Sequence, residues 1–204
     1  NTVSNNRVSN IDLKRRNSLF VHLEKSIVPK FKKSSLLAFG SSETGLSLKK
    51  GDLDLCLVVP DGNQKRIVKR ISGMMNGQGM ENVKALSRAK VPIVKFGDPR
   101  SGIDVDISIN NTLALHNTKL LAQYSQLDER VKNLAICVKY WAFHRNISDA
   151  PSGTLSSYAW SILVIQHLQL EGVIPNLQVG EDRTLVEIND IDYVIPHQAS
   201  KMAI

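Results

Sequence analysis

The chain has 204 residues, enough for one large domain or two small ones, and its 26 basic and 19 acidic residues give a formal net charge of +7. Two cysteines exclude a disulfide-stabilised scaffold, and the five histidines lack zinc-ligand spacing. The longest apolar stretch, 158–165, is too short to span a bilayer, so we expect no membrane partner. The lack of a targeting signal and the free cysteines favour a cytoplasmic location, with an organellar location as the alternative. Most basic residues precede residue 146, which suits a polyanion such as RNA, although any soluble basic surface gives the same composition.

Hydrophobic periodicity predicts a basic amphipathic helix over 11–33, with apolar residues facing inward (Ile11, Leu13, Leu19, Phe20, Leu23, Ile27 and Val28). Four strands are predicted at 35–39, 53–59, 92–96 and 102–109, and a fifth around Val83–Leu86. Helices are predicted at 63–76, 112–124, 128–145 and 154–170, and a hairpin near 184–194. This order indicates an α+β fold, in which a mixed sheet backed by helices precedes a helical region. Cys56 and Cys137 lie in apolar runs and are expected to be buried.

The first chemical signal follows the strand at 35–39. Gly40 and Ser41 form a turn whose backbone N–H groups and hydroxyl suit a phosphate, and Asp52 and Asp54 stand at the entry of the next strand. Alternate residues of a strand share a face, so the two carboxylates point the same way and repel each other unless a cation lies between them. Carboxylate oxygens select Mg²⁺ or Mn²⁺. A phosphate-binding turn beside metal-binding carboxylates indicates phosphoryl or nucleotidyl transfer, although a lone Asp-x-Asp is more often a solvated turn.

The strand at 102–109 offers a third carboxylate. Its alternation puts the aliphatic residues Val105, Ile107 and Ile109 on one face and Asp104, Asp106 and Ser108 on the other. Two-metal nucleotidyl transfer needs a carboxylate that binds metal and accepts the proton of the attacking hydroxyl. Asp104 and Asp106 are both candidates on this pattern, and an ordinary exposed edge strand would look the same.

Five segments, in this order, resemble the template-independent RNA 3′-nucleotidyltransferases of the DNA polymerase β superfamily, most of all the terminal uridylyltransferases and related poly(A)-adding enzymes. The segments are FGSSETGLSLKKGDLDLCLVV, AKVPIVKF, DVDISINNTLALHNTKLL, LAICVKYWAFHRNIS and GTLSSYAW, and they extend from about residue 35 to 165. The resemblance implies a polymerase β-like nucleotidyltransferase domain at 34–111. It also implies a helical central domain made of 11–33 and 112–204.

The resemblance assigns roles to individual residues. It makes Asp52, Asp54 and Asp106 the metal-binding catalytic carboxylates and leaves Asp104 as a solvated neighbour. The nucleotide-binding residues that it implies are Gly40, Ser41, Asn117, Lys139, Ser157 and Tyr158. Asn117 would hold the ribose and Tyr158 would stack on the base, whereas the other side chains would contact the triphosphate. The residues alone also fit roles unrelated to nucleotide binding: a surface amide at Asn117, a lysine at 139 that reaches solvent, and a core tyrosine at 158.

The chain departs from the family pattern at two points. Many relatives carry a second lysine one turn after the first on the same helix face, and here that position is Phe143. Neutralisation of the triphosphate is then weaker, unless Arg145 replaces the lysine. The family also continues with a further helical segment that reads the base, and nothing after Leu177 resembles it, so we expect the helical domain to be incomplete at its C-terminal end.

The resemblance implies Mg²⁺- or Mn²⁺-dependent addition of nucleotides to an RNA 3′ end, with UTP favoured and ATP or CTP as alternatives. Two rivals remain. A non-catalytic scaffold that binds RNA or protein would have the same fold, although all three carboxylates are present here. An oligoadenylate-synthesising or antibiotic-modifying transferase shares the Gly-Ser and Asp-x-Asp elements, but the GTLSSY and HNTKLL segments argue against it.

Overall fold

A computed structural model describes residues 8–49, 51–60, 62–179, 183–188 and 191–196 of the chain. The chain divides into two units. Val8–Ser42 and Lys49–Leu115 form the first, which we call the sheet unit, and Glu43–Leu48 and His116–Ile204 belong to the second, the helical unit. Each unit is described separately below.

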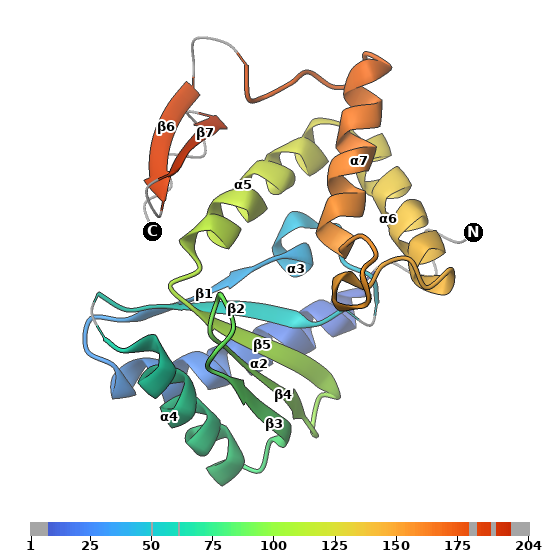
Figure 1. Cartoon of the computed structure of the whole chain (residues 1–204). Coiled ribbons are helices and arrows are strands. Elements are labelled where there is room, and N and C mark those ends of the chain that lie inside the picture. Colours follow the sequence, from blue (N-terminus) through green and yellow to red (C-terminus); the bar gives the residue numbers. More distant parts are fainter. Residues whose placement is uncertain (1–7, 50, 61, 180–182, 189–190, 197–204) are drawn as a thin grey trace. The chain divides into compact units, whose positions relative to one another are not determined.

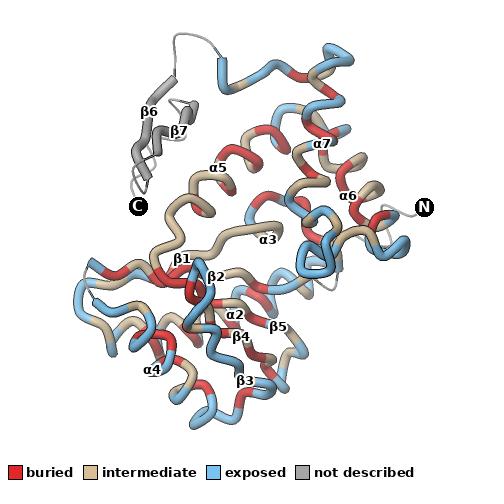
Figure 2. Tube along the Cα trace, in the orientation of Figure 1, coloured by how far each residue is buried: buried red, intermediate tan, exposed pale blue. Residues whose placement is uncertain are grey.

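The sheet unit is built on a five-stranded mixed sheet, as expected (Figure 1). The strands are β1 (Ser35–Phe39), β2 (Leu53–Val58), β3 (Glu81–Leu86), β4 (Ile93–Asp98) and β5 (Ile103–Ile109), and their order across the sheet is β1-β2-β5-β4-β3. The two central strands, β2 and β5, run parallel, and every other neighbouring pair is antiparallel. Edge strand β3 is largely exposed, whereas most of β2 and β5 is buried (Figure 2).

Helices α2 (Asn10–Ile27) and α4 (Gln64–Gly77) share one hydrophobic core with the sheet. The strand residues of this core alternate, as period-2 patterning predicts: Leu53, Leu55 and Leu57 come from β2, and Val105, Ile107 and Ile109 from β5. Their packing partners on the helices include Leu19, Leu23, Ile27, Val68, Ile71 and Met75. Because alternate side chains of a strand point to opposite faces, Asp54 and Asp106 point away from these helices.

Helix α2 differs from its prediction in extent, in the residues that it buries and in its placement. A capping box between Ser9 and Asp12 starts it, and it ends at Ile27, where a 3₁₀ turn over Val28–Lys30 with Pro29 near its start follows. Ile11 and Leu13 are exposed rather than inward, because they lie off the helical stripe that leads to Leu19, Leu23 and Ile27. This helix also packs on the sheet and belongs to the sheet unit, whereas the family resemblance groups residues 11–33 with the helical domain.

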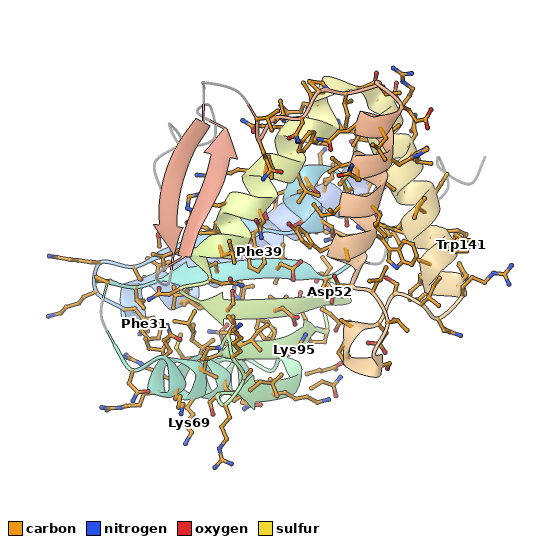
Figure 3. The ribbon with its side chains drawn as sticks, turned by 45° about the horizontal axis from the view of Figure 1, so that its top comes forward. Phe31, Phe39, Asp52, Lys69, Lys95 and Trp141 are labelled. Carbon is orange, nitrogen blue, oxygen red and sulfur yellow. The ribbon has the colours of Figure 1, made fainter. Side chains whose placement is uncertain are left out.

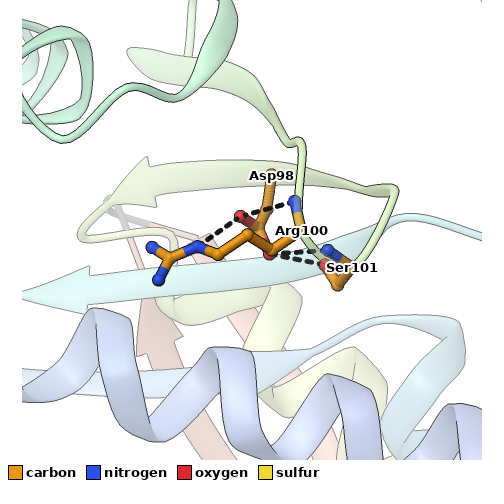
Figure 4. Close-up of polar contacts among 3 residues, drawn as sticks. All are labelled: Asp98, Arg100 and Ser101. Atoms are coloured by element: carbon orange, nitrogen blue, oxygen red, sulfur yellow. Dashed lines mark hydrogen bonds and ion pairs between the residues drawn. The ribbon is translucent and has the colours of Figure 1, made fainter.

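The turn between β4 and β5 is held by Asp98, which is 5% exposed (Figure 4). Its carboxylate accepts hydrogen bonds from the backbone N–H of Ser101 at 3.1 Å and from the Ser101 hydroxyl at 2.7 Å, and it lies 3.7 Å from Nε of Arg100. A tight, side-chain-capped turn fixes the register of the two strands that it joins. Here that register places Lys95 of β4 opposite Asp106 of β5.

The helical unit contains α6 (Glu129–His144) and α7 (Ser157–Leu170), together with all but the first turn of α5 (Thr112–Leu127). Its core cluster draws on all three helices and on the segment near Leu46, and includes Leu120, Tyr124, Val131, Ala135, Val164 and Leu168. The antiparallel strands β6 (Arg183–Ile188) and β7 (Ile191–Pro196) form the hairpin expected near 184–194. No helix in the described part of the chain is both long and apolar enough to cross a membrane.

Candidate active site

The expected Gly-Ser turn lies where β1 ends. Phe39, the last residue of β1, pairs with Asp54 of β2, and Gly40 follows with φ of +77°. A Cβ atom on Gly40 would lie only 3.1 Å from Cγ of Asp54 and closer still to a carboxylate oxygen. Only glycine tolerates both this backbone conformation and this approach. Ser41 then begins a short helical turn, α3 (Ser41–Thr44), where the sequence predicts only a turn.

Asp54 and Asp106 are direct partners on the parallel strands β2 and β5. Neighbouring strands are about 4.8 Å apart, so two carboxylates on the same face at paired positions lie close together. Burial, followed by repulsion from Asp106 and Asp52, raises the pKa of Asp54 to about 7. An acid whose pKa lies this far above its ordinary range is typical of a site built to hold a cation or a proton.

Asp52 stands one residue before β2, on the same side of the strand as Asp54. Loss of hydration, followed by repulsion from Asp106 and Asp104, raises the pKa of Asp52. The three carboxylates proposed from the sequence therefore share one electrostatic environment. Asp104 is exposed, as expected for a solvated neighbour, although its charge reaches Asp52.

Lys95 is a member of the site that our sequence reasoning did not single out. Its ammonium group forms an ion pair and a hydrogen bond with Asp106, whose side chain is 14% exposed. Figure 3 labels Lys95 on the sheet and Asp52 near the start of β2. The positive charge of Lys95 opposes the upward shift in the pKa of both Asp52 and Asp54. The sequence did contain a signal for Lys95, because side chains alternate along a strand. Val94 and Phe96 are buried in the core, so Lys95 must face the other side of the sheet.

Arg16 of helix α2 is a second residue that sequence reasoning missed. Its guanidinium group donates a hydrogen bond from Nη1 to the Asp52 carbonyl oxygen at 3.0 Å, and another from Nη2 to the Gly51 carbonyl oxygen. The residue is 5% exposed. A signal did exist in the sequence, because residues 16, 19, 23 and 27 follow helical spacing and a charged residue occupies the first of these core positions.

Whether these carboxylates can hold a metal ion depends on their arrangement as well as their chemistry. The donor set of oxygens and its mutual repulsion suit Mg²⁺ or Mn²⁺. Within the described ranges, however, no three acidic, histidine or cysteine side chains converge closely enough to hold an ion as they stand. Asp106 is turned toward Lys95 instead. A cation bound here would therefore compete with the Lys95 ammonium group for Asp106.

The remaining predicted nucleotide-binding residues lie on the helices of the helical unit. Lys139 of α6 is 5% exposed, and its ammonium group donates to the Leu46 carbonyl oxygen at 2.6 Å, so it does not simply extend into solvent. Asn117 of α5 is half-buried. Ser157 and Tyr158 open helix α7, where Ser156 is the capping residue, and Tyr158 is 46% exposed. Tyr158 is thus available for stacking rather than enclosed in the core.

Phe143, at the position where many relatives carry a second lysine, is 63% exposed near the end of α6. Arg145 directly follows that helix and is also exposed.

The two cysteines differ: Cys56 is fully buried, as expected, and Cys137 is half-buried.

Comparison with known proteins gives a consistent match. A family model described as "Poly(A) RNA polymerase, mitochondrial-like, central palm domain" matches residues 1–126. The chain is 38% identical over 176 residues to poly(A) RNA polymerase GLD2-B of Xenopus laevis, covering 82% of this chain and 35% of that protein. It is 40% identical over 178 residues to terminal uridylyltransferase 7 of Homo sapiens, covering 82% of this chain and 12% of that protein.

Solved structures show the same likeness. A structure of the Cid1 poly(U) polymerase with Mg 3′-dATP bound superposes with a TM-score of 0.88 at 30% identity, covering 98% of this chain and 64% of that one. A structure of a cytoplasmic RNA terminal U-transferase gives a TM-score of 0.83 at 31% identity, covering 98% and 62%. The relatives and structures described above include a poly(A) polymerase as well as uridylyl-adding enzymes, so the similarity does not identify the nucleotide that is added.

Proposed function

The chain belongs to the family of poly(A) RNA polymerases and terminal uridylyltransferases, and on that premise we propose that it catalyses template-independent addition of nucleotides to RNA 3′ ends. The single observation that carries the proposal is the cluster on the sheet. Asp54 and Asp106 are paired on adjacent strands, Asp52 shares their electrostatic environment, and the pKa of Asp54 is raised to about 7. A non-catalytic scaffold has no need to retain such mutually repelling carboxylates at its sheet centre.

In the proposed reaction the RNA 3′ hydroxyl attacks the α-phosphate of a nucleoside triphosphate in line, and pyrophosphate leaves. Asp52, Asp54 and Asp106 would provide the oxygen ligands for two Mg²⁺ or Mn²⁺ ions. Such ions stabilise the attacking and leaving oxygens of an in-line displacement. Asp106 is the candidate for the position nearest the attacking oxygen, where a carboxylate also accepts the hydroxyl proton. Lys95 is the ion-pair partner of Asp106.

The proposed nucleotide contacts are those that the resemblance to the family implies. Gly40 and Ser41 offer backbone N–H groups and a hydroxyl to a phosphate, and Lys139 and Ser157 are candidates for the rest of the triphosphate. Asn117 is the candidate for the ribose, and Tyr158, with its exposed ring, for stacking on the base. Because Phe143 stands where many relatives carry a second lysine, we expect weaker neutralisation of the triphosphate than in those relatives.

We propose UTP as the favoured substrate, in line with the uridylyltransferases and poly(U) polymerase to which the chain is similar. Poly(A) addition is the alternative, which similarity to GLD2-B supports equally. CMP addition is a third possibility of the same chemistry. The chain spans 35% and 12% of the two curated relatives described above, so the test requires the whole protein that contains it.

The experiment incubates that protein with an end-labelled oligoribonucleotide, Mg²⁺ and one nucleoside triphosphate at a time. We expect a ladder of extended products that is longest with UTP, and none with an Asp54→Asn variant. A ladder that is longest with ATP or CTP would overturn the uridylyl preference and keep the nucleotidyltransferase assignment. No extension with any of the four nucleotides, from protein that binds RNA, would favour the scaffold.

A further inference from the structure

The buried guanidinium of Arg16 has no role in the chemistry proposed above, yet it contacts the backbone of Asp52, one of the three clustered aspartates. Helix α2 brings it to the segment just before β2, more than thirty residues away in sequence. There Nη1 and Nη2 each donate to a main-chain carbonyl, one on Asp52 and one on Gly51. The planar fork of an arginine holds two acceptors in a fixed relative position, which a lysine ammonium cannot do.

Arg16 could serve only to anchor helix α2 to the sheet. The helix is already anchored there by Leu19, Leu23 and Ile27, which are at most 5% exposed in the shared core. An apolar side chain at position 16 would continue that stripe without the cost of burying a charge. Burial does penalise the charged form of Arg16 and lowers its pKa. The fold therefore retains a buried cation at a helix position that reaches the backbone of Asp52.

The contacts of Arg16 show what it can control. No described carboxylate lies within ion-pair distance of it, and its Nε atom is buried without a hydrogen-bond partner. Asp52 and Asp54 act on it only through longer-range attraction, after Asp12. The hydrogen bonds of Arg16 are thus made to the backbone that carries the Asp52 side chain, and not to any carboxylate. Outer groups of this kind set the direction in which a ligand side chain points.

We propose that Arg16 is a positioning residue for Asp52: by clamping the carbonyl oxygens of Gly51 and Asp52, it fixes the backbone so that the Asp52 carboxylate can join Asp54 and Asp106 around a divalent cation. The inference rests on the proposed function, because it takes these three residues as the cation site. Arg16 itself touches neither substrate nor cation.

Geometry and charge make opposite predictions, which allows a sharp test. If Arg16 acted only through its positive charge, removing it would tighten cation binding, because a charge that repels the cation would be gone and the net charge of the site would be more negative. If it acts by positioning, Arg16→Met weakens binding, and Arg16→Lys also weakens it even though the charge remains. Loss of an outer-shell partner typically costs about 10–100-fold in metal affinity, so we expect a loss of about tenfold or more.

The test measures Mn²⁺ affinity by electron paramagnetic resonance for the whole protein, its Arg16→Met and Arg16→Lys variants, and Arg15→Met as a matched control. Arg15 carries the same charge on the same helix and is exposed. Titrations are made on protein shown to be folded by circular dichroism, so that a loss of stability is not read as a loss of affinity. Asp52→Asn marks the affinity expected when the ligand itself is lost.

We expect both Arg16 variants to fall toward the Asp52→Asn value and Arg15→Met to match the wild type. Wild-type-like or tighter binding in Arg16→Met, with Asp52→Asn impaired, would overturn the positioning role while leaving the proposed function intact. Absence of Mn²⁺ binding in the wild type itself would overturn both. If the Arg16→Met variant does not fold, Arg16→Lys decides alone, since it keeps the charge and loses the fork.

Discussion

Asp54 and Asp106 occupy paired positions on two parallel strands, and Lys95 pairs with Asp106 from the other side. Two acids and a lysine thus form one lateral row across the sheet. The lysine opposes the upward shift in the pKa of Asp54, but burial and the charges of Asp106 and Asp52 still raise that pKa to about 7.

Stability of the metal-free protein should fall as pH rises from about 4 to about 7. The pKa of Asp54 is raised from 3.8 to about 7 on folding, so within this window the folded state binds more protons than the unfolded state. Deprotonation then costs folding free energy. Thermal melts in EDTA across this window measure the effect, and an Asp54→Asn variant should flatten the decline. Melting temperatures that rise through the window in the wild type, and equally in the variant, would contradict the shifted pKa.

Gly40→Ala should impair the site more than Gly45→Ala, although both glycines have positive φ. A left-handed conformation costs a non-glycine residue about 1–2 kcal/mol, so both variants should lose roughly that much stability. Only at Gly40 does the added methyl group meet the Asp54 carboxyl; at Gly45 the nearest atom is Cε of Lys132 at 3.5 Å. Chemical denaturation and Mn²⁺ titration of both variants test the difference. Equal Mn²⁺ affinities would mean that the Gly40 contact does not shape the site.

Lys95→Met should destabilise the metal-free protein at pH 8, because Asp106 loses its counter-ion beside Asp54 and Asp52. Adding Mn²⁺ should remove most of the deficit, since a bound cation supplies the missing positive charge and stabilises the folded state by mass action. Lys84→Met is the control: Lys84 pairs with Lys95 from edge strand β3 and is exposed. Melting temperatures with and without Mn²⁺ give the comparison. A deficit that Mn²⁺ leaves unchanged would show that Lys95 acts through packing.

Tyr158→Ala should weaken binding of a nucleoside triphosphate by about 1–3 kcal/mol, the range for a lost base–aromatic stack. Tyr158→Phe should be close to neutral, because the ring is what stacks. Isothermal titration with a non-hydrolysable UTP analogue measures both. Were the phenylalanine variant as weak as the alanine variant, the hydroxyl group would be the important feature and the stacking role would be wrong.

Local patterning was enough to predict most elements of the fold. Strand β1 matches its predicted bounds, and β2, β4 and β5 deviate by only one or two residues at either end, because a strict alternation of apolar residues marks a strand with one face in the core. The same alternation correctly put Asp106 on the face opposite Val105 and Ile107. The end of helix α2 was wrong by several residues, since Pro29 tightens the chain into a 3₁₀ turn that periodicity does not detect.

Contacts between distant segments were beyond the sequence. Nothing local indicates that β5 lies beside β2, and the pairing of Asp54 with Asp106 depends on that strand order. Lys95 could be assigned to a face but not to a partner, because its pairing needs the register of β4 on β5. In the sequence Arg16 is one of several charges on a basic helix. Its hydrogen bond to the Asp52 carbonyl oxygen forms only because helix α2 packs on the sheet.

The most direct test of the central claim compares two aspartates on the same face of β5. Asp106→Ala and Asp104→Ala remove the same group two residues apart, but only Asp106 is paired with Asp54 and Lys95. RNA extension by the whole protein, measured with Mg²⁺ and UTP in single turnover, should fall by several orders of magnitude in Asp106→Ala, since metal stabilisation of the transition state is worth several kcal/mol. Asp104→Ala should retain most of the activity. Near-wild-type extension by Asp106→Ala would contradict the assignment of these carboxylates to catalysis.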